Sequence, residues 1–375
     1  MTFLERLLEN IAEIQFKYPL VIFLIVILLS VFFVIGALQI KTSPDLDGDP
    51  PDLEVYKIGD RIEDEFGGRE SVLVFVELDD EIDSKQAPID IRDPEIIEFL
   101  IKLEDNLLEE DKITGVQSIG SPFRVIGIPE STDEVKAIVS QIPGANTLFN
   151  KDYTATMLFA YSEIEMDDVD ELTDIIKEKI DLSSKPLGVR TSVTGGPPLM
   201  SLILKLIIKD GVFTLLLSAG VIFLLLVFLK KSFVKGVLVF FPLILGVGWT
   251  MGTMGWLGIE ITMATVGLGA ILLGLGVEYS IFIFERYFEE KEKNSDLDAL
   301  KIALSKVGYS IIGSGSTTVV GFLALTLSIS SMLADLGLAL AIGIGYSLLI
   351  AVLINPAIII LYERITERFK NAKNS

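Results

Sequence analysis

Six stretches of this sequence are long and apolar enough to cross a lipid bilayer as helices, and no other feature constrains the fold as strongly. A hydrocarbon core about 30 Å thick requires roughly 20 apolar residues in a helix. Of the 375 residues 50% are hydrophobic, which exceeds the usual content of soluble domains. We therefore predict an α-helical polytopic membrane protein with six transmembrane helices. The predicted spans are Tyr18 to Ile40, Gly211 to Leu229, Phe233 to Leu257, Ile259 to Phe284, Tyr309 to Ser328 and Met332 to Tyr362.

The charges of the loops predict the orientation of these spans. Basic residues collect before the first span, between the second and third, between the fourth and fifth, and after the sixth. By the positive-inside rule these segments and both chain ends are cytoplasmic, in the cell membrane. The short connections near Gly258 and Ser331 then lie outside. The residues that set this orientation are Arg6, Lys17, Lys230, Lys231, Lys235, Arg286, Lys291, Lys293, Lys301, Lys306, Arg364, Arg368, Lys370 and Lys373.

Residues 41–200, between the first two spans, carry the whole net negative charge of the chain, which is −21. Their apolar pattern predicts strand, helix, strand, strand, helix, strand, the split βαβ order of a ferredoxin-like α+β domain outside the membrane. A helix from Thr132 to Gln141 is expected in an insertion between the second and third strands. The predicted strands are Ser71 to Leu78, Ile113 to Ile119, Thr154 to Ser162 and Val189 to Thr194, and the helices are Pro94 to Glu110 and Asp167 to Ile180.

The chain then divides into residues 1–40, 41–200, 201–363 and a tail, 364–375. After the breaker Gly195-Gly196-Pro197-Pro198, Lys205 and Lys209 lie one helical turn apart on a helix that enters the membrane. Two interpretations are open. The lysines could snorkel at the membrane surface, or their helix could transmit motion between the outer domain and the membrane core.

Composition excludes several classes of chemistry. The sequence has no Cys and no His, so disulfides, thiolate or imidazole metal sites and Ser-His-Asp triads are ruled out. It has no GxxxxGK[ST] phosphate loop, and its acidity disfavours a nucleic-acid partner. The acidic run Asp45 to Pro50 is either a cation site or a solvated linker, and the missing ligands of a calcium loop favour the linker. We expect neither an enzyme nor a bound cofactor or metal.

One carboxylate, Glu278, stands in the apolar, glycine-rich fourth span. With the span starting at Ile259, Glu278 would lie about 12 Å from Arg286 and about 27 Å from Glu260 along the helix. A charge at that depth costs roughly 2.5–3.5 kcal/mol and typically serves proton or ion movement. The alternative is a permanently protonated carboxyl that donates a hydrogen bond between helices. Tyr279 follows directly and points about 100° away, toward another face.

Small and hydroxyl residues surround this position in the sequence. Gly267, Gly269, Gly274 and Gly276 are expected to let neighbouring helices approach closely around Glu278, and packing alone explains them best. The fifth span supplies hydroxyls that could line a proton path, or could bond only to their own helix. These hydroxyls include Ser310, Ser314, Ser316, Thr317 and Thr318.

The chain resembles the resistance-nodulation-division (RND) superfamily, most closely its MMPL-type and hydrophobe/amphiphile exporter branches. One helix, a large outer domain and five more helices match that plan. The matching motifs are GGPPLM before the second span with Asp210, GLGVEYSIFIFERYFEE in the fourth, STTVVGFLAL in the fifth, and LADLGLALAIGIGYSLLIAVLINPAIIILYERI. The resemblance covers essentially the whole chain, and the fourth-span motif is fairly specific.

This resemblance implies a secondary transporter driven by the proton-motive force, which exports or relocates lipids or other amphiphilic molecules through a porter domain. It implicates Glu278 and Tyr279 as the proton relay, with Ser316, Thr317 and Thr318 as weaker candidates. The family more often has Asp where this chain has Glu278, so the geometry of the relay differs by one methylene. Sodium is the alternative coupling ion.

Typical members carry two six-helix repeats in one chain, and this sequence carries one. A single repeat leaves the repeat interface uncovered, so we expect a homodimer, with a trimer as the alternative. Two other functions stay open. SecD and SecF, which assist protein export, share the six-helix plan, and sterol-sensing domains share the five-helix core without transporting.

Overall fold

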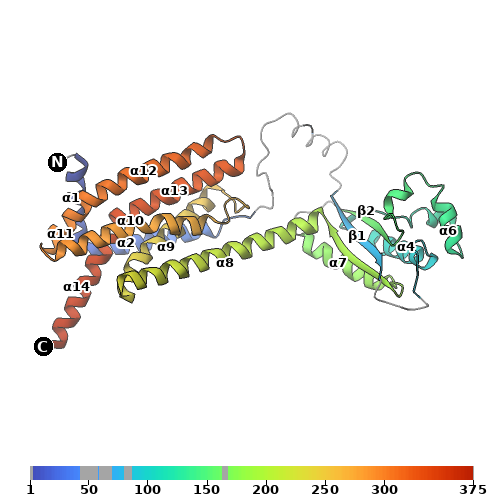
Figure 1. The fold of residues 1–375 in the computed structure, drawn as a ribbon, viewed down its shortest axis with the longest axis horizontal. Coiled ribbons are helices and arrows are strands. Elements are labelled where there is room, and N and C mark those ends of the chain that lie inside the picture. The colour runs from blue at the N-terminus through green and yellow to red at the C-terminus, as the bar shows by residue number, and fades with distance from the viewer. Residues whose placement is uncertain (1–2, 43–57, 59–69, 80–86, 163–167, 375) are drawn as a thin grey trace. The chain divides into compact units, whose positions relative to one another are not determined.

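The computed structural model describes residues 3–42, 58, 70–79, 87–162 and 168–374. The acidic run at residues 45–50 lies outside this part of the chain. The structure divides into two compact units (Figure 1). The helical unit comprises residues 1–52 and 206–375, and the α+β unit comprises residues 53–205.

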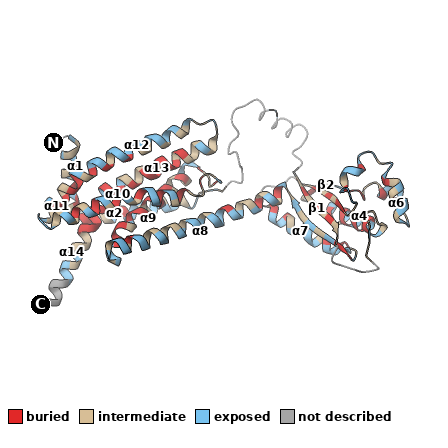
Figure 2. Ribbon diagram, viewed as in Figure 1, coloured by how far each residue is buried: buried red, intermediate tan, exposed pale blue. Residues whose placement is uncertain are grey.

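The helical unit contains the six predicted spans, which are long and apolar enough to cross a membrane. Figure 2 shows that its buried residues gather on α9, α10 and α13, whereas α8 and α12 are largely exposed. The helices of this unit are α1 (Phe3–Lys17), α2 (Pro19–Ala37), α8 (Gly196–Lys230), α9 (Phe233–Leu257), α10 (Leu268–Lys291), α11 (Asp296–Ile302), α12 (Tyr309–Leu323), α13 (Ser331–Leu353) and α14 (Asn355–Asn374). A π-helical turn, η3 (Ala303–Gly308), joins α11 to α12, and a 3-10 turn, η4 (Ala324–Leu327), follows α12.

The start of the fourth span differs from the prediction. α10 begins at Leu268 and not at Ile259, because a turn occupies the residues between. Gly258 ends α9 with φ at 72°, and the Thr265 hydroxyl then accepts from the Thr262 N–H at 2.9 Å and donates to the Glu260 carbonyl at 2.9 Å. These side-chain bonds offer the backbone an alternative to helix.

The sixth span is broken into α13 and α14 at Asn355-Pro356, as the proline predicts. Pro356 has no N–H, so the Val352 carbonyl lacks its donor within the helix. The buried Gln15 side chain supplies that donor from α1, with Nε2 2.8 Å from the Val352 oxygen. The sequence analysis did not anticipate α1, although its apolar residues have helical spacing and bury Leu8 and Ala12.

Helices α2 and α9 pack through glycines. A Cβ added to Gly255 would lie 1.8 Å from the Gly36 carbonyl oxygen, and one added to Gly252 would lie 2.3 Å from the Phe33 carbonyl oxygen. These distances mean that the two backbones are in direct contact, as at small-residue interfaces between membrane helices. The Phe33 and Trp249 rings stack beside this contact with centroids 5.0 Å apart.

The α+β unit contains a four-stranded sheet with the order β2-β3-β1-β4, and every neighbouring pair is antiparallel. This order confirms the predicted split βαβ arrangement. The main elements are β1 (Glu70–Leu78), α4 (Pro94–Leu108), β2 (Ile113–Gln117), β3 (Ala155–Ser162), α7 (Val169–Leu182) and β4 (Val189–Gly195). The insertion between β2 and β3 contains α5 (Phe123–Ile126), α6 (Thr132–Val139) and the 3-10 turn η1 (Ala145–Leu148).

Alternation along β1 explains how this unit is held together. Val72, Val74 and Val76 are fully buried and share one core with α4 and α7. Capping fixes the start of α4, where the Asp93 side chain accepts from the Glu95 N–H at 3.0 Å and Pro94 occupies the first turn.

The first turns of α8 also belong to this unit. There Lys205 pairs with Asp170 of α7 at 2.7 Å, a partner that snorkelling would not require.

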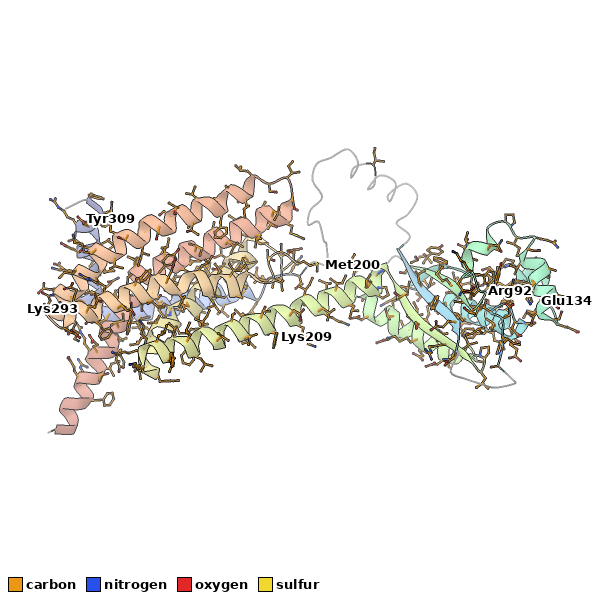
Figure 3. All side chains as sticks on the ribbon, viewed as in Figure 1. Arg92, Glu134, Met200, Lys209, Lys293 and Tyr309 are labelled. Carbon is orange, nitrogen blue, oxygen red and sulfur yellow. The ribbon has the colours of Figure 1, made fainter. Side chains whose placement is uncertain are left out.

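An ion pair in the α+β unit makes its stability depend on acidity. Figure 3 labels Arg92 within this unit. Asp90 accepts from Arg92 Nε at 2.8 Å and from its terminal nitrogen at 2.7 Å, and Arg92 lies 3.5 Å from the centre of the Tyr153 ring. Burial opposes the charge on Asp90, but hydrogen bonds from Arg92 and Lys136 outweigh it and lower the pKa of Asp90 from 3.8 to about 2.

A folded-state pKa below the unfolded value stabilises the fold above about pH 4, and this stabilisation disappears as the pH falls toward 2. Asp90→Asn should therefore lower the unfolding free energy of this unit by about 1–2 kcal/mol at pH 6.5, allowing for solvent screening. Pulse proteolysis of the full-length protein in urea measures the change. An equal loss in Asp133→Asn, whose carboxylate is exposed, would contradict this assignment.

Candidate functional site

Glu278 lies near the middle of α10. It is ten residues after Leu268 and thirteen before Lys291, or about 15 Å and 20 Å along the axis. Because α10 starts later than predicted, the helical segment before Glu278 is shorter than the sequence suggested. Tyr279 is buried, with 3% of its surface exposed, whereas Glu278 is exposed on the surface of the chain. The two side chains serve different faces, as their 100° separation predicts.

Exposed residues one or two helical turns from Glu278 form one face of α10. Ile271 and Leu275 precede Glu278 by one to two turns, and Phe282 follows it by one turn, all exposed. Within the described part of the chain, no side chain forms a hydrogen bond or ion pair with the Glu278 carboxylate. A carboxylate in the middle of a membrane span thus faces away from the core of its own subunit. We call Ile271, Gly274, Leu275, Glu278 and Phe282 the α10 face.

Residues of α10 and α12 line one groove. The Thr318 side chain also lies close enough to Tyr279 to interact with its hydroxyl. About one turn from these residues, Phe282 of α10 and Ser314 of α12 line this groove, which has a volume of about 360 Å³. Arg286 and Ser310 line it one turn beyond, together with Lys306. Hydroxyls therefore line a groove between the level of Tyr279 and the cations near the end of α10.

The three predicted hydroxyl residues have different surroundings. Thr318 contacts Tyr279 and also donates to the Ser314 carbonyl at 3.4 Å. The Thr317 hydroxyl donates to the Ser314 carbonyl at 2.6 Å, and Ser316 is exposed. Of these three, only Thr318 thus lies near Tyr279. Sequence analysis grouped Ser310 and Ser314 with the other hydroxyls but did not place them on the groove, because that requires the register of α10 against α12.

The glycines near Glu278 differ in their surroundings. A Cβ on Gly276 would lie 2.8 Å from Ser347 Oγ of α13, and one on Gly269 would lie 2.8 Å from Leu215 Cδ1 of α8. Gly267 and Gly274 have open space at that position, so no described residue of this chain packs against them within 4 Å. Gly267 lies just before the helix, and Gly274 belongs to the exposed α10 face. Gly274 instead leaves room next to Glu278.

The chemistry available at this site is proton transfer by a carboxyl group and hydroxyls. Among the residues that the structure describes, no cluster of three or more acidic side chains could hold a metal ion. A second cluster of charged residues lies at the end of α10. There Glu363 of α14 accepts from Tyr287 and, at 2.6 Å, from Lys291, which also pairs with Asp296 at 3.1 Å. This cluster holds α14 against α10.

Known proteins resemble this chain over very different lengths. Protein MJ1562 of Methanocaldococcus jannaschii is 33% identical over 374 residues, which covers 96% of this chain and 95% of that protein. MmpL12, a probable transport protein of Mycobacterium tuberculosis, is 33% identical over 117 residues, 31% of this chain and 10% of MmpL12. The sulfolipid-1 exporter MmpL8 of that species is 29% identical over 98 residues, 26% of this chain and 9% of MmpL8.

The match to mycobacterial transporters is therefore partial, and this chain spans only about a tenth of their length. The sequence profile of the MMPL family matches residues 124–374, from α5 to α14 and so across the whole candidate site. Together with the six apolar spans and the relative of equal length, this match shows a multi-pass membrane protein distantly related to the mycobacterial MmpL transporters of the RND type. The chain belongs to the MMPL family.

Proposed function

We propose that this protein is a proton-driven secondary transporter that moves lipids or other amphiphilic molecules, with Glu278 as the proton carrier. The observation that carries the proposal is the position of Glu278 in the middle of α10, directly before the buried Tyr279. Ionisable residues at such depth are costly and mark proton or ion pathways. The sulfolipid-1 exporter among its partial relatives supports an amphiphilic substrate.

The groove between α10 and α12 suggests how protons leave Glu278. Its hydroxyl lining, Ser314 and Ser310, extends from the level of Tyr279 toward Arg286 and Lys306. Hydroxyls both donate and accept, so they can pass a proton through ordered water. The positive-inside rule places these cations on the cytoplasmic side, and both chain ends with them. Protons would then enter from outside, bind Glu278 and leave through this groove.

We further propose that two copies pair across the α10 face. A carboxylate that faces lipid in mid-membrane would cost roughly 2.5–3.5 kcal/mol, and a second copy removes it from lipid. Gly274 leaves open space beside it, which allows close approach of another helix. Because a two-fold interface brings the same patch of both subunits together, each pair would hold two Glu278 side chains near one axis.

The absence of Cys makes this pairing directly testable by crosslinking. Leu275→Cys and Phe282→Cys, both on the α10 face, are expected to form disulfide-linked dimers in native membranes on mild oxidation, because a two-fold axis brings equivalent residues together. Leu224→Cys is the matched control, since it is 68% exposed on α8 away from this face. Equal crosslinking at all three positions, or a native mass of three copies, would contradict a two-fold pair.

Transport itself is tested with the purified protein in vesicles that contain dye-labelled lipids. Proton-driven transport predicts that an imposed pH gradient accelerates transfer of the labelled lipid to albumin outside. A lipid-sensing protein would bind lipid without any effect of the gradient. A protein-export accessory in the manner of SecD and SecF would crosslink to a translocon and leave lipid transfer unchanged.

A further inference from the structure

A basic groove lies in the helical unit at the junction of α1 and α2, far in sequence from α10. Lys17, Tyr18 and Pro19 form one wall, because Pro19 starts α2 immediately after α1 ends. Helix α14 forms the other wall with Arg364 and Arg368, which lie one turn apart on one helix face. The cavity between the walls has a volume of about 310 Å³.

The cations of this groove are available to a ligand. Within the described residues, Lys17, Arg364 and Arg368 form no ion pair with any carboxylate. Arg364 donates to the Phe16 carbonyl and lies 4.8 Å from the centre of the Phe16 ring, which fixes its guanidinium at the groove. Glu363, the neighbouring acid on α14, is already engaged by Tyr287 and Lys291. The charges on the groove therefore remain unbalanced.

The rest of the lining is apolar and exposed. Leu20 and Val21, in the first turn of α2, are 56% and 51% exposed, and Ile365 of α14 is 45% exposed. These side chains lie where α2 enters the apolar part of the membrane, whereas Lys17 precedes the helix. Along the first wall, the cation Lys17 thus precedes the apolar Leu20 and Val21, which is the order of a phospholipid headgroup and its chains.

We propose that this groove binds an anionic phospholipid. The phosphate contacts Lys17, Arg364 and Arg368, and the proximal parts of the acyl or isoprenoid chains lie against Leu20, Val21 and Ile365. Guanidinium groups pair with phosphate oxygens through two parallel hydrogen bonds, so two arginines and one lysine form a fitting receptor. The groove is lined by neither α10 nor α12, so this site is separate from the proposed proton relay and stands whether or not the protein transports.

Native mass spectrometry of the full-length protein, titrated with phosphatidylglycerol and with phosphatidylcholine, tests the proposal. We expect tighter binding of phosphatidylglycerol to the wild type. The triple variant Lys17→Gln, Arg364→Gln, Arg368→Gln should weaken phosphatidylglycerol binding by about a hundredfold, since each of the three cations near a headgroup contributes about a factor of five. Phosphatidylcholine binding should change little.

Two further variants keep the result interpretable. Lys17→Gln with Arg368→Gln leaves the Arg364 contact to Phe16 intact, so it should fold normally and still lose most of the phosphatidylglycerol preference. The control Lys231→Gln, Lys235→Gln, Lys293→Gln removes the same charge from exposed positions outside the groove and should bind as the wild type does.

Three results would overturn the proposal. One is equal affinity of the wild type for the two lipids, and another is an equal loss in the control triple variant. The third is displacement of phosphatidylglycerol from the wild type by inorganic phosphate at an equal concentration, because the chains would then contribute nothing to binding.

Discussion

Glu278→Gln is expected to reduce gradient-driven lipid transfer by at least about a hundredfold, the usual lower bound for losing a positioned proton donor and acceptor. Glutamine has nearly the same shape and keeps hydrogen-bonding capacity, but it cannot take up or release a proton. Because Glu278 is exposed on its own subunit, the substitution opens no cavity and should leave folding unchanged. The loss is measured as the initial rate of dye-labelled lipid transfer from vesicles under an imposed pH gradient.

Two variants separate loss of the proton carrier from loss of charge on α10. Glu278→Asp keeps a carboxyl one methylene shorter and should retain measurable transfer. Glu285→Gln removes a carboxylate two turns further along α10 that pairs with Lys230, and it should transfer lipid at the wild-type rate. If Glu278→Gln transfers lipid as fast as Glu285→Gln, Glu278 is not the proton carrier.

Gly255→Val is expected to prevent assembly of the helical unit. The added Cβ would lie 1.8 Å from the Gly36 carbonyl oxygen. The oxygen is part of the α2 backbone and the Cβ is attached directly to the α9 backbone, so the clash can be relieved only by separating α2 from α9. Overpacking in a core usually costs 1–3 kcal/mol, and backbone contact offers less relief than side-chain contact, so the loss should be about 3 kcal/mol or more. Fluorescence-detected size exclusion with a thermal ramp measures the surviving folded fraction.

Gly248→Val is the matched control for this experiment, because it introduces the same side chain into the same helix. Gly248 has nothing within 4 Å of its Cβ position, so the variant should behave as the wild type does. Similar losses of folded protein in both variants would mean that the helix propensity of valine, and not the contact between α2 and α9, decides the outcome.

The sequence predicted the architecture well, because its strongest signals are local. Apolar length alone identified six spans, and the third was predicted with its observed bounds, Phe233 to Leu257. Alternating apolar residues such as Val72, Val74 and Val76 predicted the strands of the α+β unit. The start of α10 was missed because side-chain bonds of Thr262 and Thr265 compete with helix inside an apolar stretch.

The sequence suggested candidate site residues but could not predict their surroundings. The depth of Glu278 follows from composition, but its exposure depends on which face of α10 the bundle covers. The pairing of Tyr279 with Thr318 depends on the register of two helices separated by more than 30 residues. Whether a glycine such as Gly274 or Gly276 packs tightly depends on that same register, so periodicity could not distinguish them.

The most direct test of a proton-coupled carrier is to follow proton entry and lipid transfer together in one preparation of wild-type vesicles. A pH-sensitive dye inside the vesicles reports protons, and albumin outside collects the labelled lipid. We predict that a proton gradient drives transfer, that a protonophore abolishes it, and that a sodium gradient of equal size has no effect. Lipid transfer that continues at the same rate after the protonophore collapses the gradient would contradict the account.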